Sequence, residues 1–90
     1  MSETQESRLK RMRMRAWRRG TKEMDLVLGP YADTQLALMS EADLLAFDAL
    51  LAENDQDLMS WMLGQIAPPA AHADLIKVLS SHASTRLRAN

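Results

Sequence analysis

Apolar residues recur every three or four positions along most of the chain, a spacing that predicts amphipathic helices. The first such segment covers 8–19, where Leu9, Met12 and Ala16 fall on one face of the predicted helix. Ser7 precedes this segment and can serve as its N-cap. The pattern therefore predicts a first helix with one buried face and several arginines elsewhere on its surface.

A second helix is predicted to begin near Thr21, and its apolar stripe is interrupted by Gly29 and Pro30. Proline lacks a backbone N–H, and its ring clashes with the preceding turn of a helix. We therefore expect a kink or a short break at Pro30, with the helix resuming over 32–38. The residues of the stripe, spaced i, i+3, i+4 and i+7, are Met24, Val27, Leu28 and Tyr31.

Two more helices are predicted in the middle of the chain. Ser40 and Asp43 resemble a capping box with Asp in place of the usual Glu, which places a helix over 41–52. Asn54 or Asp55 can cap the helix that follows. The expected buried faces are Leu44, Phe47 and Leu51 in the first of these helices, and Leu58, Trp61 and Met62 in the second.

The last predicted helix covers 70–87 and follows a stiff, proline-containing connector at 66–69. Gly64 suits the left-handed position just beyond a helix end. No segment alternates as a strand does, so we predict an all-α fold, a small bundle of four to five short helices. We expect one domain over 7–90 behind a disordered tail at 1–6. The expected inward face of the last helix is Leu75, Val78, Leu79 and His82.

Charge is distributed unevenly along the chain. Residues 1–23 carry eight Lys or Arg and three acidic residues, whereas residues 24–74 carry nine acidic residues and no Lys or Arg. This asymmetry bears on binding partners rather than on the fold.

The chain has no cysteine, which excludes disulfides and zinc fingers, and no apolar run approaches the ~20 residues of a membrane span. We therefore expect a soluble, cytoplasmic protein.

The residue types that usually carry catalysis are sparse. His72 and His82 are ten residues apart, whereas metal ligands on one helix are typically three or four apart. We interpret His72 as a surface residue and His82 as an amphipathic one. The three glycines are too dispersed for a phosphate-binding loop, and a bundle of this size is a poor host for a catalytic triad. We expect no catalytic residue and no metal.

The segment from Trp17 to Asp25 concentrates charge where the basic arm meets the acidic body. Gly20 can be either the left-handed residue after the first helix or the N-cap of the second, which would place Glu23 at the third helical position. Tryptophan and arginine are enriched in the energetic centres of interfaces. The alternative is that Gly20 only ends a helix and that Glu23 pairs with Arg19. The residues themselves favour the two interpretations about equally.

These residues resemble a known family. Arg19-Gly20-Thr21-Lys22-Glu23 matches the Arg-Gly-x-x-Glu motif of the SdhE family, the flavinators or assembly factors of succinate dehydrogenase. Residues 15–29 are similar to the first two helices of that family, and 54–62 are similar to its acidic cap and tryptophan-bearing fourth helix. The similarity covers about residues 8–82. Pro30 and Tyr31 depart from the residues that many relatives carry there.

The resemblance implies a non-enzymatic assembly factor that binds the flavoprotein subunit of succinate dehydrogenase, and in some bacteria that of fumarate reductase. It implies that the chain promotes covalent attachment of FAD to a histidine of that subunit while holding no cofactor of its own. Arg19, Gly20 and Glu23 would form an exposed surface on the subunit, and Gly20 would allow close backbone approach. Residues added because they adjoin the motif are Arg15, Trp17 and Asp25.

An alternative function is a small regulatory or antitoxin-type protein that binds a partner protein or nucleic acid through its basic N-terminal helix. This alternative predicts an affinity that falls steeply with salt, because phosphate contacts release counterions. The acidic body and the overall pI of about 6.1 make nucleic acid the less favoured partner.

Overall fold

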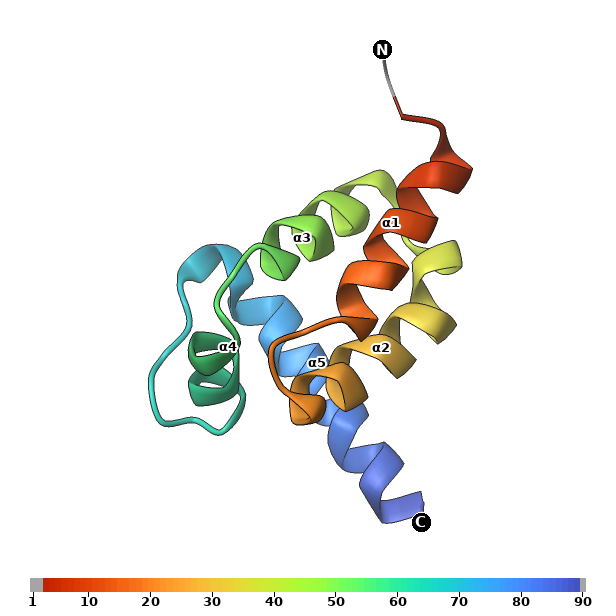
Figure 1. Ribbon diagram of the computed structural model, residues 1–90. Coiled ribbons are helices and arrows are strands. Elements are labelled where there is room, and N and C mark those ends of the chain that lie inside the picture. The colour runs from red at the N-terminus through yellow and green to blue at the C-terminus, as the bar shows by residue number, and fades with distance from the viewer. Residues whose placement is uncertain (1–2, 90) are drawn as a thin grey trace.

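The computed structural model describes residues 3–89, with side chains for residues 3–83. This part of the chain contains five α-helices and one 3₁₀ turn, η1, and no strand, which confirms the all-α prediction (Figure 1). No helix within it is long and apolar enough to span a bilayer. The elements are α1 (Gln5–Trp17), α2 (Lys22–Gln35), η1 (Leu36–Leu38), α3 (Glu41–Leu51), α4 (Asp55–Met62) and α5 (Ala70–Ala89).

The first helix starts earlier than its sequence pattern indicated. Thr4, not Ser7, is the N-cap of α1, and its hydroxyl accepts a hydrogen bond from the Ser7 backbone N–H at 3.1 Å. Both residue types can cap a helix, and the upstream candidate adds a further turn of backbone hydrogen bonds. As a result, α1 includes Gln5 and Glu6, which lie within the segment that we expected to be a tail.

Of the kink or short break expected at Pro30, the break does not occur. Helix α2 runs unbroken from Lys22 to Gln35 with Pro30 inside it, and η1 follows directly. A proline removes one helical N–H, but Leu28, Tyr31 and Ala32 on either side of it are buried in the core. Burial of an amphipathic face supplies most of a helix's stability in a protein, so packing outweighs the local cost of the proline.

The caps predicted for the later helices are confirmed. Ser40 caps α3 by accepting a hydrogen bond from the Asp43 N–H. Asn54, rather than Asp55, caps α4 and accepts from two backbone N–H groups of its first turn. Gly64 follows the end of α4 with φ of 77°, the left-handed conformation that favours glycine.

One apolar core joins the helices. Helix α1 packs against α2 and α3, and α5 crosses the bundle to contact α2, α3 and α4 (Figure 1). The inward faces predicted for the first four helices are largely confirmed. The face predicted for α5 is only partly right: Leu79 is buried, but Val78 is half exposed, and Ile76 and His72 turn inward instead. The core residues are Met12, Ala16, Met24, Leu28, Tyr31, Ala32, Leu36, Leu44, Phe47, Leu50, Leu51, Leu58, Ile76 and Leu79.

Candidate functional site

The connection between α1 and α2 is held by carboxylates from the starts of two helices. The Arg19 N–H donates to Oδ1 of Asp25 in α2 at 2.6 Å, and the Gly20 N–H donates to the carboxylate of Asp55 in α4. Thr21 ends the connection as the N-cap of α2. Two consecutive backbone donors of the motif are therefore satisfied within the chain.

The Arg19 side chain is inside the molecule, so the prediction that it is exposed is wrong. Only 8% of this side chain and 14% of the Asp55 side chain are accessible, and Arg19 Nε donates to Asp55 Oδ1 at 2.8 Å. The two terminal nitrogens donate at 2.7 Å to the backbone carbonyls of Leu51 and Glu53, at the end of α3. We call this set, Arg19 with Asp55 and the carbonyls of Leu51 and Glu53, the arginine hub.

The hub explains why an arginine and an aspartate occupy these positions. A guanidinium offers several N–H donors in a fixed plane, so one side chain can serve two carbonyls and a carboxylate together. Its positive charge also lies at the C-terminal end of α3, where the helix dipole is negative. The hub therefore fixes the end of α3, the start of α4 and the motif relative to one another.

Neither conformation predicted for Gly20 is observed. Gly64 is the glycine with a positive φ in the described chain, and the N-cap of α2 is Thr21, so Glu23 is the second helical residue rather than the third. What Gly20 provides is space. A Cβ built on Gly20 would lie 2.8 Å from Oδ2 of Asp55, closer than Cβ atoms normally come to an oxygen. The close approach at Gly20 is thus made by a residue of the same chain.

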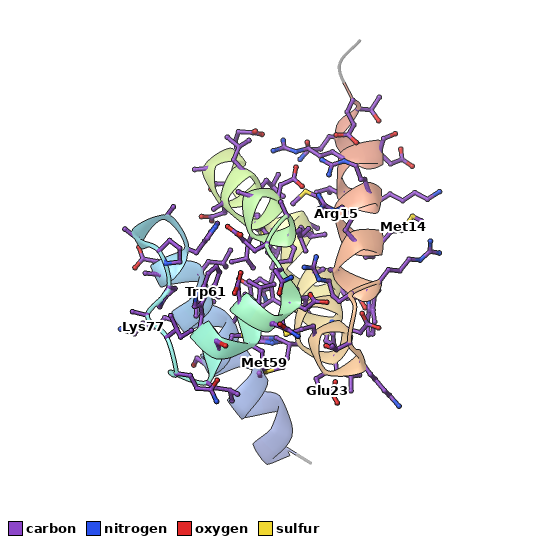
Figure 2. The ribbon with its side chains drawn as sticks, turned by 60° about the vertical axis from the view of Figure 1, so that its left-hand side comes forward. Met14, Arg15, Glu23, Met59, Trp61 and Lys77 are labelled. Carbon is purple, nitrogen blue, oxygen red and sulfur yellow. The ribbon has the colours of Figure 1, made fainter. Side chains whose placement is uncertain are left out.

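A shallow groove of about 480 Å³ lies beside the motif, between the start of α2 and α4. Glu23 is exposed on one side of it, and Met59 is partly buried on the other. Figure 2 shows these two side chains at the same end of the molecule. We call this feature the motif groove; it is lined by Thr21, Glu23, Asp55, Gln56, Met59 and Ser60.

Trp17 lies on the other side of the connection and joins α1 to α2. A Cβ on Gly29 would collide with the Trp17 ring, so the ring lies directly on the backbone of α2. The indole Nε1–H donates to the Asp33 carboxylate at 3.1 Å, and 37% of the residue remains accessible. Trp17 therefore has a packing role that the sequence did not indicate, besides the partner contact that we predicted.

Three arginines of α1, Arg8, Arg11 and Arg15, are paired with residues of α3, whereas Arg13 pairs with Asp33 of α2. Arg15 donates to the Leu51 carbonyl at 3.1 Å, so one carbonyl receives both Arg15 and Arg19. Arg11 makes two parallel bonds to Asp48, at 2.8 and 2.9 Å, and Arg8 bonds Glu41 at 2.8 Å. We call these contacts between α1 and α3 the ion-pair ladder; it comprises Arg8, Arg11, Arg15, Glu41 and Asp48.

The ladder changes the acid–base properties of its carboxylates. The hydrogen bonds from Arg11 lower the pKa of Asp48 below its ordinary value of 3.8, and Arg8 lowers the pKa of Glu41 below 4.5 in the same way. These carboxylates therefore remain charged at neutral pH. Of the arginines that suggested a nucleic-acid surface, Arg8, Arg11, Arg13 and Arg15 have carboxylate partners within the chain.

His72 is the clearest error in our interpretation of the histidines. It is buried, with 7% of its surface accessible, and its Nε2 lies 2.8 Å from Oε2 of Glu53. Its ring stacks on Trp61 of α4 at a centroid distance of 5.8 Å. Because the Glu53 carbonyl belongs to the arginine hub, this contact connects α5 to the hub. The described residues contain no cluster of three or more side chains able to hold a metal.

Comparison with known proteins gives consistent matches. Residues 10–83 match the family model described as Sdh5, flavinator of succinate dehydrogenase. The FAD assembly factor SdhE of Aliivibrio fischeri is 35% identical over 74 residues, covering 81% of this chain and 86% of the relative. SdhE of Legionella pneumophila (strain Lens) is 36% identical over 63 residues, covering 70% and 76%. The mitochondrial succinate dehydrogenase assembly factor 2 of Mycosarcoma maydis is 36% identical over 72 residues, 80% of this chain but 30% of that longer protein.

Proposed function

Because the chain belongs to the family of succinate dehydrogenase flavinators, we propose that it binds the flavoprotein subunit of succinate dehydrogenase and promotes covalent attachment of FAD to that subunit. The observation that carries this proposal is the family match over residues 10–83, which includes the whole motif at 19–23 and Asp55 of the arginine hub. The flavoprotein subunit of fumarate reductase is a second client to be tested in the same way.

The chain acts in this proposal as a non-enzymatic helper. The histidine and the FAD belong to the partner, and the chain contributes a rigid surface that holds the two close and aligned. Holding reacting groups in the right geometry lowers a barrier substantially without any chemical group from the helper. The hub and the bond from the Arg19 N–H to Asp25 support this role, because together they fix the motif to α2, α4 and the end of α3. We place this action in the cytoplasm.

Among the six predicted contact residues, Glu23 is the best candidate for direct contact with the partner. Its side chain is exposed on the motif groove, whereas Arg19 is buried and the Asp25 carboxylate is occupied by the Arg19 N–H. Arg15 and Trp17 keep exposed surface beyond their internal contacts. Gly20 is exposed, as predicted, but Asp55 occupies the space where a side chain at this position would extend.

The test is covalent flavin on the succinate dehydrogenase flavoprotein, read by in-gel fluorescence in cells that lack this gene. The cells receive the wild type, Glu23→Gln, or Lys77→Gln as a matched control. Lys77 is an exposed residue of α5 far from Glu23 (Figure 2). We expect flavin attachment to be lost in the deletion, restored by wild type and Lys77→Gln, and reduced with Glu23→Gln. Normal flavin attachment in the deletion strain would overturn the proposal.

The geometry does not favour the regulatory alternative. Arg8, Arg11 and Arg15 of the basic helix bond to carboxylates of α3, which lowers the positive charge available to a nucleic acid.

A further inference from the structure

We propose that Asp55 is a positioning residue through which Gly20 acts, and that the motif groove it shapes is where the flavoprotein subunit docks. This inference rests on the proposed function above. It gives the exposed Gly20 an intramolecular role, because the glycine leaves room for a carboxylate that holds α4 against the start of α2.

Gly20 has no room for a side chain. A Cβ there would lie 2.8 Å from Asp55 Oδ2, so even alanine requires the carboxylate to move. A carboxylate at the surface could swing aside at little cost. The Asp55 carboxylate cannot, because only 14% of its side chain is accessible and it is bonded to Arg19 Nε and to the Gly20 N–H together.

Asp55 ties the start of α4 to the motif. It is the first residue of α4, a helix of eight residues. Asp55 Oδ1 bonds the Arg19 side chain, and Oδ2 bonds the motif backbone two residues before α2 begins. The Asp55 side chain thus joins the two walls of the motif groove, with Thr21 and Glu23 on one wall and Gln56, Met59 and Ser60 on the other. Displacing Asp55 would change the separation of these walls.

The groove offers both a charged and an apolar surface. Glu23 is exposed and has no ion-pair partner within the described part of the chain, so it is the free carboxylate of the groove. Met59 provides the apolar surface. Complementary charge directs association and fixes its register. The groove therefore fits a segment of the flavoprotein subunit that brings a basic side chain to Glu23 and an apolar side chain to Met59.

A double-mutant cycle separates this inference from direct contact between Gly20 and the partner. Dissociation constants are measured for wild type, Gly20→Ala, Asp55→Ala and the double variant, against flavoprotein subunit purified without covalent FAD from cells lacking this gene. If Gly20 acts through Asp55, each single change weakens binding by about tenfold. The double variant then binds within about twofold of Asp55→Ala, because the displaced carboxylate is already absent.

A second measurement keeps the inference testable if Asp55→Ala is poorly folded. Asp55→Ser also removes the crowded carboxylate and replaces it in the cycle. Amide hydrogen exchange of Gly20→Ala alone then reports on the groove directly. We expect faster exchange in α4, with α2 unchanged, at a temperature where circular dichroism shows the variant fully helical. Unchanged exchange in α4 would contradict the inference whatever the binding data show.

The outcomes distinguish the two proposals. If the two substitutions act independently, the double variant binds the subunit about a hundredfold more weakly than wild type, which is the product of the single effects. This result would show that Gly20 contacts the partner itself. That result would overturn this inference and leave the proposed function intact. Failure of the wild-type chain to bind the subunit would overturn the proposed function, and the groove with it.

Discussion

The arginine hub and the ion-pair ladder use the same two kinds of side chain, yet their environments differ. In the hub, Arg19 and Asp55 are 8% and 14% accessible. In the ladder, each pair has a more exposed member: Arg11 and Asp48 are 38% and 26% accessible, and Arg8 and Glu41 are 15% and 66% accessible. Both sets of contacts tie the N-terminal third of the chain to acidic residues later in the sequence.

Burial decides what each set does. An exposed ion pair gains little, because water screens the attraction and two long side chains lose freedom, so such pairs contribute about 0–1 kcal/mol. Removing one partner of a buried pair leaves an uncompensated charge in the interior and costs about 3–5 kcal/mol. The hub is therefore a structural requirement of the site, whereas the ladder mainly neutralises the charge of the basic helix.

The largest expected effect comes from breaking the hub. Arg19→Ala leaves the Asp55 carboxylate buried without its cation and takes away the donors to the Leu51 and Glu53 carbonyls. We expect the free energy of unfolding to fall by about 3–5 kcal/mol and Tm to fall by more than about 10 °C, measured by urea and thermal unfolding. Arg18→Ala, an exposed neighbour, is the control and should change stability by less than about 0.5 kcal/mol. Equal losses of unfolding free energy in the two variants would mean that a buried arginine stabilises the chain no more than an exposed one.

A smaller loss of unfolding free energy is expected when the central arginine of the ladder is removed. Arg11→Ala removes the bonds to Asp48 and Glu3, all of them partly solvated. We expect a loss of at most about 1 kcal/mol in the free energy of unfolding. Because this contribution is electrostatic and screened, the difference from wild type should shrink in 1 M salt, at a Debye length of about 3 Å. A loss above about 3 kcal/mol, unchanged by salt, would place the ladder in the same class as the hub.

The free energy of unfolding is expected to depend weakly on pH through Asp48. Arg11 holds the pKa of Asp48 below its ordinary 3.8, so the unfolded chain binds this proton more readily than the folded one. The stabilisation is fully present above about pH 4 and is lost as pH falls through the lowered pKa of the folded state. Wild type should therefore exceed Asp48→Asn in unfolding free energy at pH 6 by less than about 1 kcal/mol, and the gap should close as the pH falls through the lowered pKa of Asp48 in the folded state. A gap that widened on acidification would contradict this assignment.

The smallest effect is expected at the start of the ladder. Arg8, whose own side chain is 15% accessible, bonds Glu41, whose side chain is largely in water. Arg8→Ala should give a Tm indistinguishable from that of wild type in thermal unfolding at about 0.15 M salt, because solvent replaces the lost contact. A clear fall in Tm would show that packing of the arginine stem, not its charge, stabilises α1.

Features within a few residues of one another were predictable from the sequence. The caps Ser40 and Asn54, the left-handed Gly64 and the spacing of the core faces follow from rules that act within one helical turn. The type of each element was therefore evident before the structure, and the motif at 19–23 could be singled out from the charge and glycine that it combines.

Features that depend on distant partners were not predictable. The uninterrupted α2 at Pro30, the inward turn of His72 and the burial of Arg19 arise from contacts with segments far along the chain. Arg19 and Asp55 are separated by 36 positions, so no local pattern joins them.

Propensity, capping and hydrophobic period are local properties, so the helices and the residue types of the motif could be predicted from the amino-acid sequence. The burial of the Arg19 side chain, the space that Gly20 leaves for Asp55 and the exposure of Glu23 depend on how the helices pack. Burial and close approach arise only once the folded chain has brought distant residues together, so no local pattern predicts them.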